Sequence, residues 1–416
     1  MSVIISETTQ LIGGFIKMNY DFTTQVSRKN TGSHKWNLMY DQNPSVEEGV
    51  CPLSVADMEF KNPPEVYQGL IKYLKSEPIL GYTGPTEEYL EAVINWQERR
   101  HHWAVKKDWI VTTPGVVAAL NVAIRSFSEE EDGIIIFQPV YHPFENSILA
   151  NNRTLVNVPL LNINEEYTID FKSFEEEAAK PENKMLIFCS PHNPVGRVWQ
   201  KAELEQLAEI AIKHDLTVVS DEIWHDFVRE DKEHTVLHTV NSKLQDHLIT
   251  CTSASKTFNL AGVATSNIII SNDEMRQKFS EEAQKSSVSG VNVFGFEATK
   301  IAYTECEDWF EELNHLIYEN QQMVKEFFEE NYPKIKAPVS EGTYVQWLDF
   351  SALEMPDKDL EAFLHEHQFF TNAGYTFGKE GSGFQRINVA LPKKALEKLL
   401  DGLLEALLTS DKQINA

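Results

Sequence analysis

Three polar side chains stand at the ends of apolar, β-branched runs, and together they could carry out chemistry. Asn193 follows MLIFCS (185–190), Asp221 ends LTVVSD, and Lys256 comes shortly after LITCTS. An amine, a carboxylate and an amide could attack a carbonyl carbon, keep a ring nitrogen protonated and hydrogen-bond an oxygen, as a bound cofactor requires. Each residue also has a plain structural explanation, as a turn residue, a helix N-cap and a surface charge respectively. Their convergence is what favours a site.

Apolar runs predict the strands that would bring these residues together. The runs that read as buried strands of a mainly parallel sheet are 134–138, 185–190, 216–222, 248–253 and 267–271. Residues 202–214 place Leu204, Leu207, Ala208 and Ala211 on one face of a helix, which completes a β-α-β unit. Open α/β folds bind ligands at the carboxyl ends of parallel strands. We therefore predict a doubly wound, mainly parallel α/β fold with the polar residues at one edge.

The character of the sequence changes near residue 306. A long helical stretch is followed there by TYVQWLDF, a glycine-rich loop and a final helix. We therefore predict a large domain at 62–305 and a smaller α+β domain formed by 18–61 plus 306–416. Residues 1–17 lack a basic leader, so they predict a flexible N-terminal extension rather than a signal peptide or an anchor.

The composition of the chain limits the classes of partner that it is expected to bind. The chain has 416 residues, and 37 Lys and Arg against 63 Asp and Glu give a net charge of −26. A surface this acidic repels phosphate backbones and anionic lipids, so we expect no nucleic-acid partner and no membrane association. The cysteines are scattered without a Cys-x-x-Cys pair, which predicts no metal site, no disulfide framework and a cytoplasmic location. They are Cys51, Cys189, Cys251 and Cys306.

Several segments, in order along the chain, carry a resemblance to a known family. The sequence resembles the fold-type I pyridoxal-phosphate enzymes of the class I/II aminotransferase superfamily from about Met18 to the C-terminal helix. The segments that carry this resemblance are SPHNPVG (190–196), SDEIW (220–224) and SASKTFNLAG (253–262). Other segments are more similar to the bacterial cystathionine β-lyase, or C-S lyase, branch than to aspartate aminotransferases. These are LSVADMEF (53–60), PGVVAAL (114–120), PVYHPF (139–144) and GYTFGKEGSGFQRINVA (374–390).

The resemblance implies a pyridoxal 5'-phosphate cofactor and assigns residues to its ring. Lys256 would form the Schiff base with the cofactor, and Asp221 would pair with the ring nitrogen. Asn193 would bond the phenolic oxygen, and Tyr141 would stack on the ring. Trp224 stands where many aminotransferases have a tyrosine that touches the cofactor oxygen, and its indole N–H can donate but not accept.

The resemblance also assigns residues to the cofactor phosphate. Gly115, Val116 and Val117 would offer backbone N–H groups where a helix begins, a position that suits an anion. Ser253 and Ser255 would add hydroxyl donors, although both could equally be helix caps.

Substrate contacts and assembly follow from the same resemblance. Arg386 matches the arginine that binds the substrate α-carboxylate, which a planar guanidinium holds through two hydrogen bonds; its alternative is a salt bridge between domains. Asn193 and Ala56 are further substrate contacts. Tyr82 matches a tyrosine that reaches the phosphate of the neighbouring subunit, which implies a homodimer with shared active sites.

The implied reaction is β-elimination from a small amino-acid substrate. We expect L-cystathionine or related cysteine thioethers to give a thiol, pyruvate and ammonia, as in methionine biosynthesis. Two alternatives stay open. The protein could be an aminotransferase, which needs a keto-acid acceptor, or a regulatory binding protein with secondary lyase activity.

Overall fold

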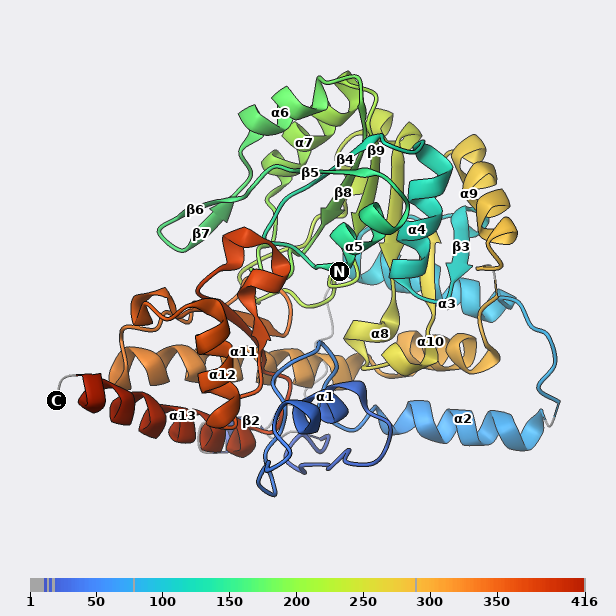
Figure 1. Cartoon of the computed structure of the whole chain (residues 1–416). Helices are drawn as coiled ribbons and strands as arrows, with labels where there is room; N and C mark the ends of the chain where they lie inside the picture. The colour runs from blue at the N-terminus through green and yellow to red at the C-terminus, as the bar shows by residue number, and fades with distance from the viewer. Residues whose placement is uncertain (1–10, 13–14, 17–18, 78, 289, 415–416) are drawn as a thin grey trace.

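A seven-stranded sheet forms the centre of the larger part of the molecule (Figure 1). The computed structural model describes residues 11–12, 15–16, 19–77, 79–288 and 290–414. In spatial order the strands are β3 (Ile110–Thr113), β11 (Ser266–Ile269), β10 (Leu248–Thr252), β9 (Thr217–Asp221), β8 (Asn183–Cys189), β4 (Gly133–Ile136) and β5 (Thr154–Asn157). Strand β11 runs antiparallel to both of its neighbours, and the other pairs are parallel. The predicted mainly parallel sheet is confirmed.

Both faces of this sheet are apolar because successive side chains of a strand point to opposite sides. In β8, Met185 and Ile187 pack in one core, whereas Leu186 and Phe188 pack in another. The first core contains α4 (Val116–Phe127), α5 (Pro143–Ala150) and α9 (Asp273–Lys285), and the second contains α6 (Phe171–Ala178) and α7 (Lys201–Lys213). Figure 1 shows these two sets of helices on opposite sides of the sheet. The predicted doubly wound arrangement is therefore confirmed.

A second, three-stranded antiparallel sheet lies in the C-terminal part of the chain. It consists of β12 (Val345–Asp349), β14 (Phe384–Asn388) and β13 (Asn372–Ala373), in that order. Helices α11 (Glu307–Asn331), α12 (Asp357–Glu366) and α13 (Lys393–Ile414) accompany it, and α1 (His34–Gln42) shares their core through Trp36 and Met39. This arrangement is the expected smaller α+β unit.

One apolar core runs across the predicted domain boundary at residue 306. Helices α3 (Glu87–His101) and α10 (Val293–Glu305) contribute Trp96 and Ala302 to the same core as Leu313 of α11. The domain boundaries therefore stay a prediction. Residues 1–10, 13–14 and 17 of the predicted extension lie outside the described residues. The remaining elements are β1 (Leu11–Ile12), β2 (Phe15–Ile16), α2 (Pro64–Ser76), β6 (Leu161–Ile163), β7 (Glu166–Thr168) and α8 (Ala254–Thr257).

Within the described parts of the chain, no helix combines the length and the apolar character that crossing a bilayer requires.

Candidate active site

The carboxyl ends of three neighbouring parallel strands open onto one cavity of about 480 Å³, called here the strand-end cavity. Strand β9 ends at Asp221, β8 leads into the turn that carries Asn193, and β10 leads into α8, which carries Lys256. All three side chains line the cavity, as the sequence predicted. Gly115, Val116, Val117, Tyr141, Trp224, Ser255, Ala56 and Arg386 line it as well.

The amine of Lys256 is held inside the cavity by a backbone carbonyl. Its Nζ donates a hydrogen bond to the oxygen of Ala56 at 2.7 Å, and it lies 5.4 Å from the centre of the Trp224 ring. Burial, reinforced by the positive charge of Arg386, lowers the pKa of Lys256 to about 8. A lysine with this pKa has a substantial neutral fraction near neutral pH, so it can act as a nucleophile or a base.

Asp221 is a buried carboxylate without a cationic partner. It accepts a hydrogen bond from the backbone N–H of Ile223 at 3.2 Å, and it forms no ion pair with any described residue. Burial raises the pKa of Asp221 to about 7. A cation beside this carboxylate would restore its charged form, because an opposite charge offsets the desolvation.

Arg386 is also buried, and its partners are neutral amides. Its Nη1 donates to Oδ1 of Asn193 at 2.9 Å, and its Nη2 donates to Oδ1 of Asn372 at 2.7 Å. The buried Nε has no hydrogen-bond partner within the described part of the chain, and the guanidinium lies 4.9 Å from the centre of the Phe377 ring. Burial lowers the pKa of Arg386 to about 10. An arginine with no carboxylate partner is suited to bind one from a ligand.

The start of α4 provides the anion-binding part of the cavity. Gly115 caps this helix with φ of 112°, a left-handed conformation that favours glycine, and no side chain caps the first N–H groups. Ser255 lines the same cavity, whereas Ser253 is not among the lining residues. The Ser253 hydroxyl donates to the oxygen of Thr265 at 2.7 Å and accepts from the N–H of Ser255. The structure therefore gives Ser253 a local structural bond, and its predicted phosphate contact stays a prediction.

Tyr82 does not line the cavity of its own chain. Its side chain is fully exposed on the segment that joins α2 to α3. Its predicted role depends on a second subunit, so it stays a prediction.

The structure adds residues to the cavity that sequence reasoning missed. Asn372 reaches it from β13 and His34 from the start of α1, and neither belongs to a motif that pointed to the site. His142 and Ser266 adjoin recognisable features, the PVYHPF segment and a strand end. Those two positions were therefore within reach of sequence reasoning, unlike Asn372 and His34.

The four cysteines are free and buried. Cys189 lines the strand-end cavity, and burial together with the charge of Asp221 raises its pKa well above the usual value. Burial also raises the pKa of Cys51 and of Cys306 to about 12. These thiols stay protonated at neutral pH.

His101, His225 and Asp226 form a buried group whose ligand atoms lie within 4.8 Å of one another, close enough to hold a metal ion. Asp226 already accepts hydrogen bonds, from Trp96 at 3.0 Å and from the Thr257 hydroxyl at 2.5 Å. Because Thr257 follows Lys256, these contacts tie α3 to the segment that carries the lysine. The absence of a metal stays a prediction from the sequence.

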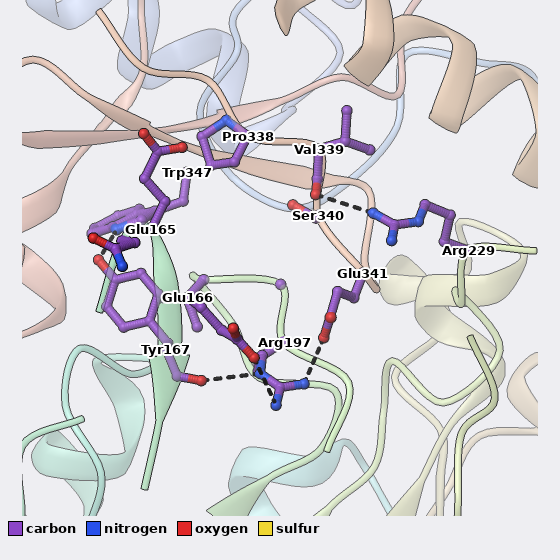
Figure 2. Close-up of a pocket in the computed structure, with 13 residues that line it drawn as sticks. Glu165, Glu166, Tyr167, Arg197, Arg229, Pro338, Val339, Ser340, Glu341 and Trp347 are labelled. Carbon is purple, nitrogen blue, oxygen red and sulfur yellow. Dashed lines mark hydrogen bonds and ion pairs between the residues drawn. The ribbon is translucent and has the colours of Figure 1, made fainter. Parts of the chain in front are cut away.

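A second depression of about 270 Å³, called here the hairpin hollow, lies beside the β6–β7 hairpin (Figure 2). Arg197 is its central charge, and Figure 2 shows it pointing toward Glu341 and the backbone of Tyr167. The guanidinium contacts Glu341 at 2.7 Å and Glu203 at 3.1 Å. Because carboxylates of the chain already neutralise this arginine, the hairpin hollow is not suited to bind an anionic substrate.

The strand-end cavity fits pyridoxal phosphate in each part of that molecule. Lys256 offers a partly deprotonated amine, and the unpaired Asp221 offers a carboxylate that a protonated ring nitrogen would match. The uncapped start of α4 offers backbone donors for a phosphate.

Comparison with known proteins agrees with this fit. The family model described as "Aminotransferase class I and II" matches residues 48–403. The chain is 35% identical over 387 residues to cystathionine beta-lyase PatB of Bacillus subtilis, strain 168, which covers 93% of this chain and 98% of that protein. It is 29% identical over 391 residues to the protein MalY of Escherichia coli, strain K12, which covers 93% and 99% respectively.

Solved structures give the same result. Cystalysin from Treponema denticola, whose crystal structure contains pyridoxal 5'-phosphate, is 49% identical with a TM-score of 0.92, covering 94% of this chain and 100% of that one. The pyridoxal-phosphate-bound C-S lyase from Staphylococcus hominis is 29% identical with a TM-score of 0.87, covering 94% and 98%.

Proposed function

Because the chain belongs to the family of class I and II aminotransferases, we propose that it is a pyridoxal-phosphate-dependent carbon–sulfur β-lyase. Its proposed substrates are L-cystathionine and related thioethers of cysteine. The observation that carries the proposal is the meeting of Lys256, Asp221 and Arg386 in one cavity, each without a counter-charge in direct contact. The relatives described as cystathionine beta-lyase and C-S lyase favour elimination over transamination.

The cofactor would be held by residues that line the strand-end cavity. When bound, pyridoxal phosphate supplies an electron-accepting ring that stabilises negative charge on the substrate Cα. Asp221 would hold the ring nitrogen in its protonated form, and the Asn193 amide would donate to the ring oxygen. The N–H groups at the start of α4, with the Ser255 hydroxyl, would hold the phosphate.

Lys256 moves the proton in the proposed reaction. Its pKa of about 8 leaves part of the amine neutral, so Nζ can take the proton from the substrate Cα. Loss of that proton allows the bond between Cβ and sulfur to break, and the sulfur leaves as a thiolate that then takes up a proton. One water is consumed overall, because cystathionine and water give homocysteine, pyruvate and ammonia. This outcome would place the enzyme in methionine biosynthesis.

Arg386 orients the substrate for that proton transfer. Its guanidinium lies in the cavity with Lys256, and its partners Asn193 and Asn372 are neutral. A substrate α-carboxylate would therefore be the first negative charge that this arginine meets. Two parallel hydrogen bonds to the carboxylate fix the direction of the Cα–H bond.

The proposed active unit is a homodimer. Tyr67, Ile71 and Leu74 expose 45–49% of their surface along one face of α2, and Ile79 exposes 83% in the following segment. Figure 1 shows α2 and that segment on the outer edge of the molecule. An exposed apolar surface of this kind supports burial against a second copy, which would carry Tyr82 to the neighbouring cavity. The free thiols support a location in the reducing cytoplasm.

The function is tested by measuring both products from L-cystathionine with no keto acid present. We expect the protein to take up pyridoxal phosphate, with a visible absorption band that borohydride removes, and to release thiol and pyruvate in equal amounts. Turnover that requires a keto acid would identify an aminotransferase instead. Uptake of the cofactor with no turnover of either kind, but capture of a specific protein partner, would favour the regulatory alternative.

The dimer is tested by complementation between two inactive variants. Tyr82→Ala and Lys256→Ala chains, when co-expressed, form mixed dimers in which one cavity has both residues intact if Tyr82 acts across the interface. We expect recovery of about one quarter of wild-type activity, because half of the dimers are mixed and each has one intact site. Recovery would not occur if Tyr82 served its own chain.

A further inference from the structure

Val55, which lines the strand-end cavity, has an unfavourable backbone conformation. Its φ is 51°, in the left-handed region that β-branched residues rarely adopt. A conformation of this kind persists only where the surrounding structure enforces it, and such positions cluster at functional sites.

Side-chain amides on the small sheet hold the Val55 turn in place. The N–H of Val55 donates to Oδ1 of Asn372 at 2.9 Å. The Nδ2 of Asn388 donates to the oxygen of Val55 at 2.9 Å and to the oxygen of Asp57 at 2.6 Å. The turn is thus held at both ends by β13 and β14 of the small sheet.

The turn presents the carbonyl of Ala56 to the reactive lysine. The Ala56 oxygen accepts from Nζ of Lys256 at 2.7 Å and from the buried Tyr344 hydroxyl at 2.8 Å. A neutral amine that donates one N–H to this oxygen keeps its lone pair away from that direction and restricts it to the two remaining staggered positions. The amine is therefore oriented by a backbone carbonyl whose own position depends on Val55.

The same amide that holds Val55 also holds the substrate-binding arginine. Oδ1 of Asn372 accepts from Nη2 of Arg386 at 2.7 Å, in addition to the N–H of Val55. This sharing follows from the register of the small sheet, in which Asn372 of β13 lies directly opposite Arg386 of β14.

We propose that Asn372 and the left-handed Val55 turn are positioning residues that couple carboxylate binding at Arg386 to the orientation of the Lys256 amine. This inference rests on the proposed function. Asn372 fixes the Val55 turn, the turn fixes the Ala56 carbonyl, and the carbonyl fixes Nζ. A substrate carboxylate that draws Arg386 away from Asn372 changes the hydrogen bond between these two side chains. Because Asn372 also holds the Val55 turn, this change reaches the Ala56 carbonyl and the Lys256 amine, which acts as the base.

The test uses cofactor capture by the apoprotein, a reaction that needs Lys256 but no substrate carboxylate. Asn372→Leu removes the shared acceptor, and we expect the rate of pyridoxal-phosphate capture to fall about tenfold, as for the loss of one orienting hydrogen bond. The midpoint of its pH profile should also shift, since the charges of Arg386, Asp57, Asp221 and Lys35 surround the amine. If Asn372 merely supported Arg386, only the KM for cystathionine would change.

Two matched variants complete the design. Thr376→Val removes a nearby hydrogen bond to the oxygen of Ala373 and leaves Asn372 intact, so capture should match the wild type. Val55→Pro fixes φ at about −65° and removes the N–H that Asn372 accepts, so the left-handed turn cannot form, and we expect capture to slow several-fold with an unchanged circular dichroism spectrum.

The outcomes separate this inference from the proposed function. Wild-type capture rates in both Asn372→Leu and Val55→Pro would overturn the inference and leave the lyase proposal standing. If Asn372→Leu does not fold, Val55→Pro alone decides between the two results. If the wild-type apoprotein captures no pyridoxal phosphate, the proposed function itself fails.

Discussion

Two buried arginines, Arg386 at the strand-end cavity and Arg197 at the hairpin hollow, show how a ligand-binding residue differs from a residue with a structural role. Arg386 is bonded to two neutral amides and has an unpartnered Nε, whereas Arg197 is bonded to carboxylates of its own chain. Both are almost fully buried, so exposure does not distinguish them. The two arginines differ in whether carboxylates of the protein already balance the positive charge of the guanidinium.

The rest of the strand-end cavity follows the pattern of Arg386. Asp221 has no cationic partner among the described residues, and the nearest bond of Lys256 is to a carbonyl. Burial shifts each pKa in the direction that favours the neutral form: the pKa of Asp221 is raised, and the pKa values of Lys256 and Arg386 are lowered. A buried ionisable group without a counter-charge lowers the stability of a folded protein. Several such groups in one cavity therefore indicate a function.

The largest effect is expected for Asp221→Asn, which removes the cavity's unmatched negative charge. We expect kcat/KM for cystathionine to fall about 100- to 1000-fold, the range for one well-placed electrostatic group, with the cofactor still bound. Pyruvate release and the visible spectrum of the same preparation check this outcome. Unchanged turnover would mean that another residue keeps the ring protonated.

A smaller loss is expected for Arg386→Lys, which keeps the charge and removes the planar fork. We expect kcat/KM to fall roughly 30- to 150-fold, with the cofactor spectrum preserved. This loss corresponds to about 2–3 kcal/mol of transition-state stabilisation. Arg197→Lys is the matched control in the hairpin hollow, where the same change should leave kcat/KM nearly unaltered. Equal losses in both variants would erase the distinction between the two arginines.

The pH dependence of cofactor capture gives a more modest effect. Because the pKa of Lys256 is lowered to about 8, its neutral and reactive fraction rises as the pH rises toward that value. Capture should therefore accelerate about fivefold between pH 7 and pH 8 and level off above it. The Asp221→Asn variant is measured in parallel, because Asp221 titrates near pH 7. A rate that still rises steeply above pH 9 would show an unperturbed lysine.

The smallest effect on catalysis is expected for Arg197→Met. It removes the cation of Glu203 and one of the two cations of Glu341, which keeps its ion pair with Lys232 at 2.7 Å, so we expect a loss of about 2–3 kcal/mol in the free energy of unfolding. Activity should change less than about twofold, because the strand-end cavity keeps its own charges. Thermal unfolding and steady-state kinetics of the same preparation separate the two effects. A large loss of activity without a loss of stability would give the hairpin hollow a catalytic role.

The sequence predicted those parts of the fold that have strong local patterns. The five central strands were recognisable as continuous apolar runs, and α7 was recognisable because its apolar residues recur with a helical period. Strands β3 and β5 were missed because neither is a continuous buried apolar run: β3 is only partly buried in its first half, and β5 is exposed or only partly buried along its length. Their pairing depends on neighbours that are distant in the sequence, which no short window reveals.

The residues of the site also divide into those that the sequence revealed and those that it did not. Residues that follow predicted strands, such as Asp221 and Lys256, were found by position, and Arg386 was found by resemblance. Asn372 was missed because its role arises from the register of β13 against β14, which places it opposite Arg386. Ser253 was expected to bind phosphate, but a cap and a donor look alike in sequence until their partner, the oxygen of Thr265, is known.

The burial of every cysteine has a consequence for an enzyme that releases thiols. Thiol–disulfide exchange requires a thiolate that can reach the attacking or leaving sulfur. Cys189, although it lines the strand-end cavity, is held protonated by its surroundings, and Cys51 and Cys306 ionise only near pH 12. Burial of these thiols therefore disfavours mixed disulfides between the protein and homocysteine or its oxidised forms.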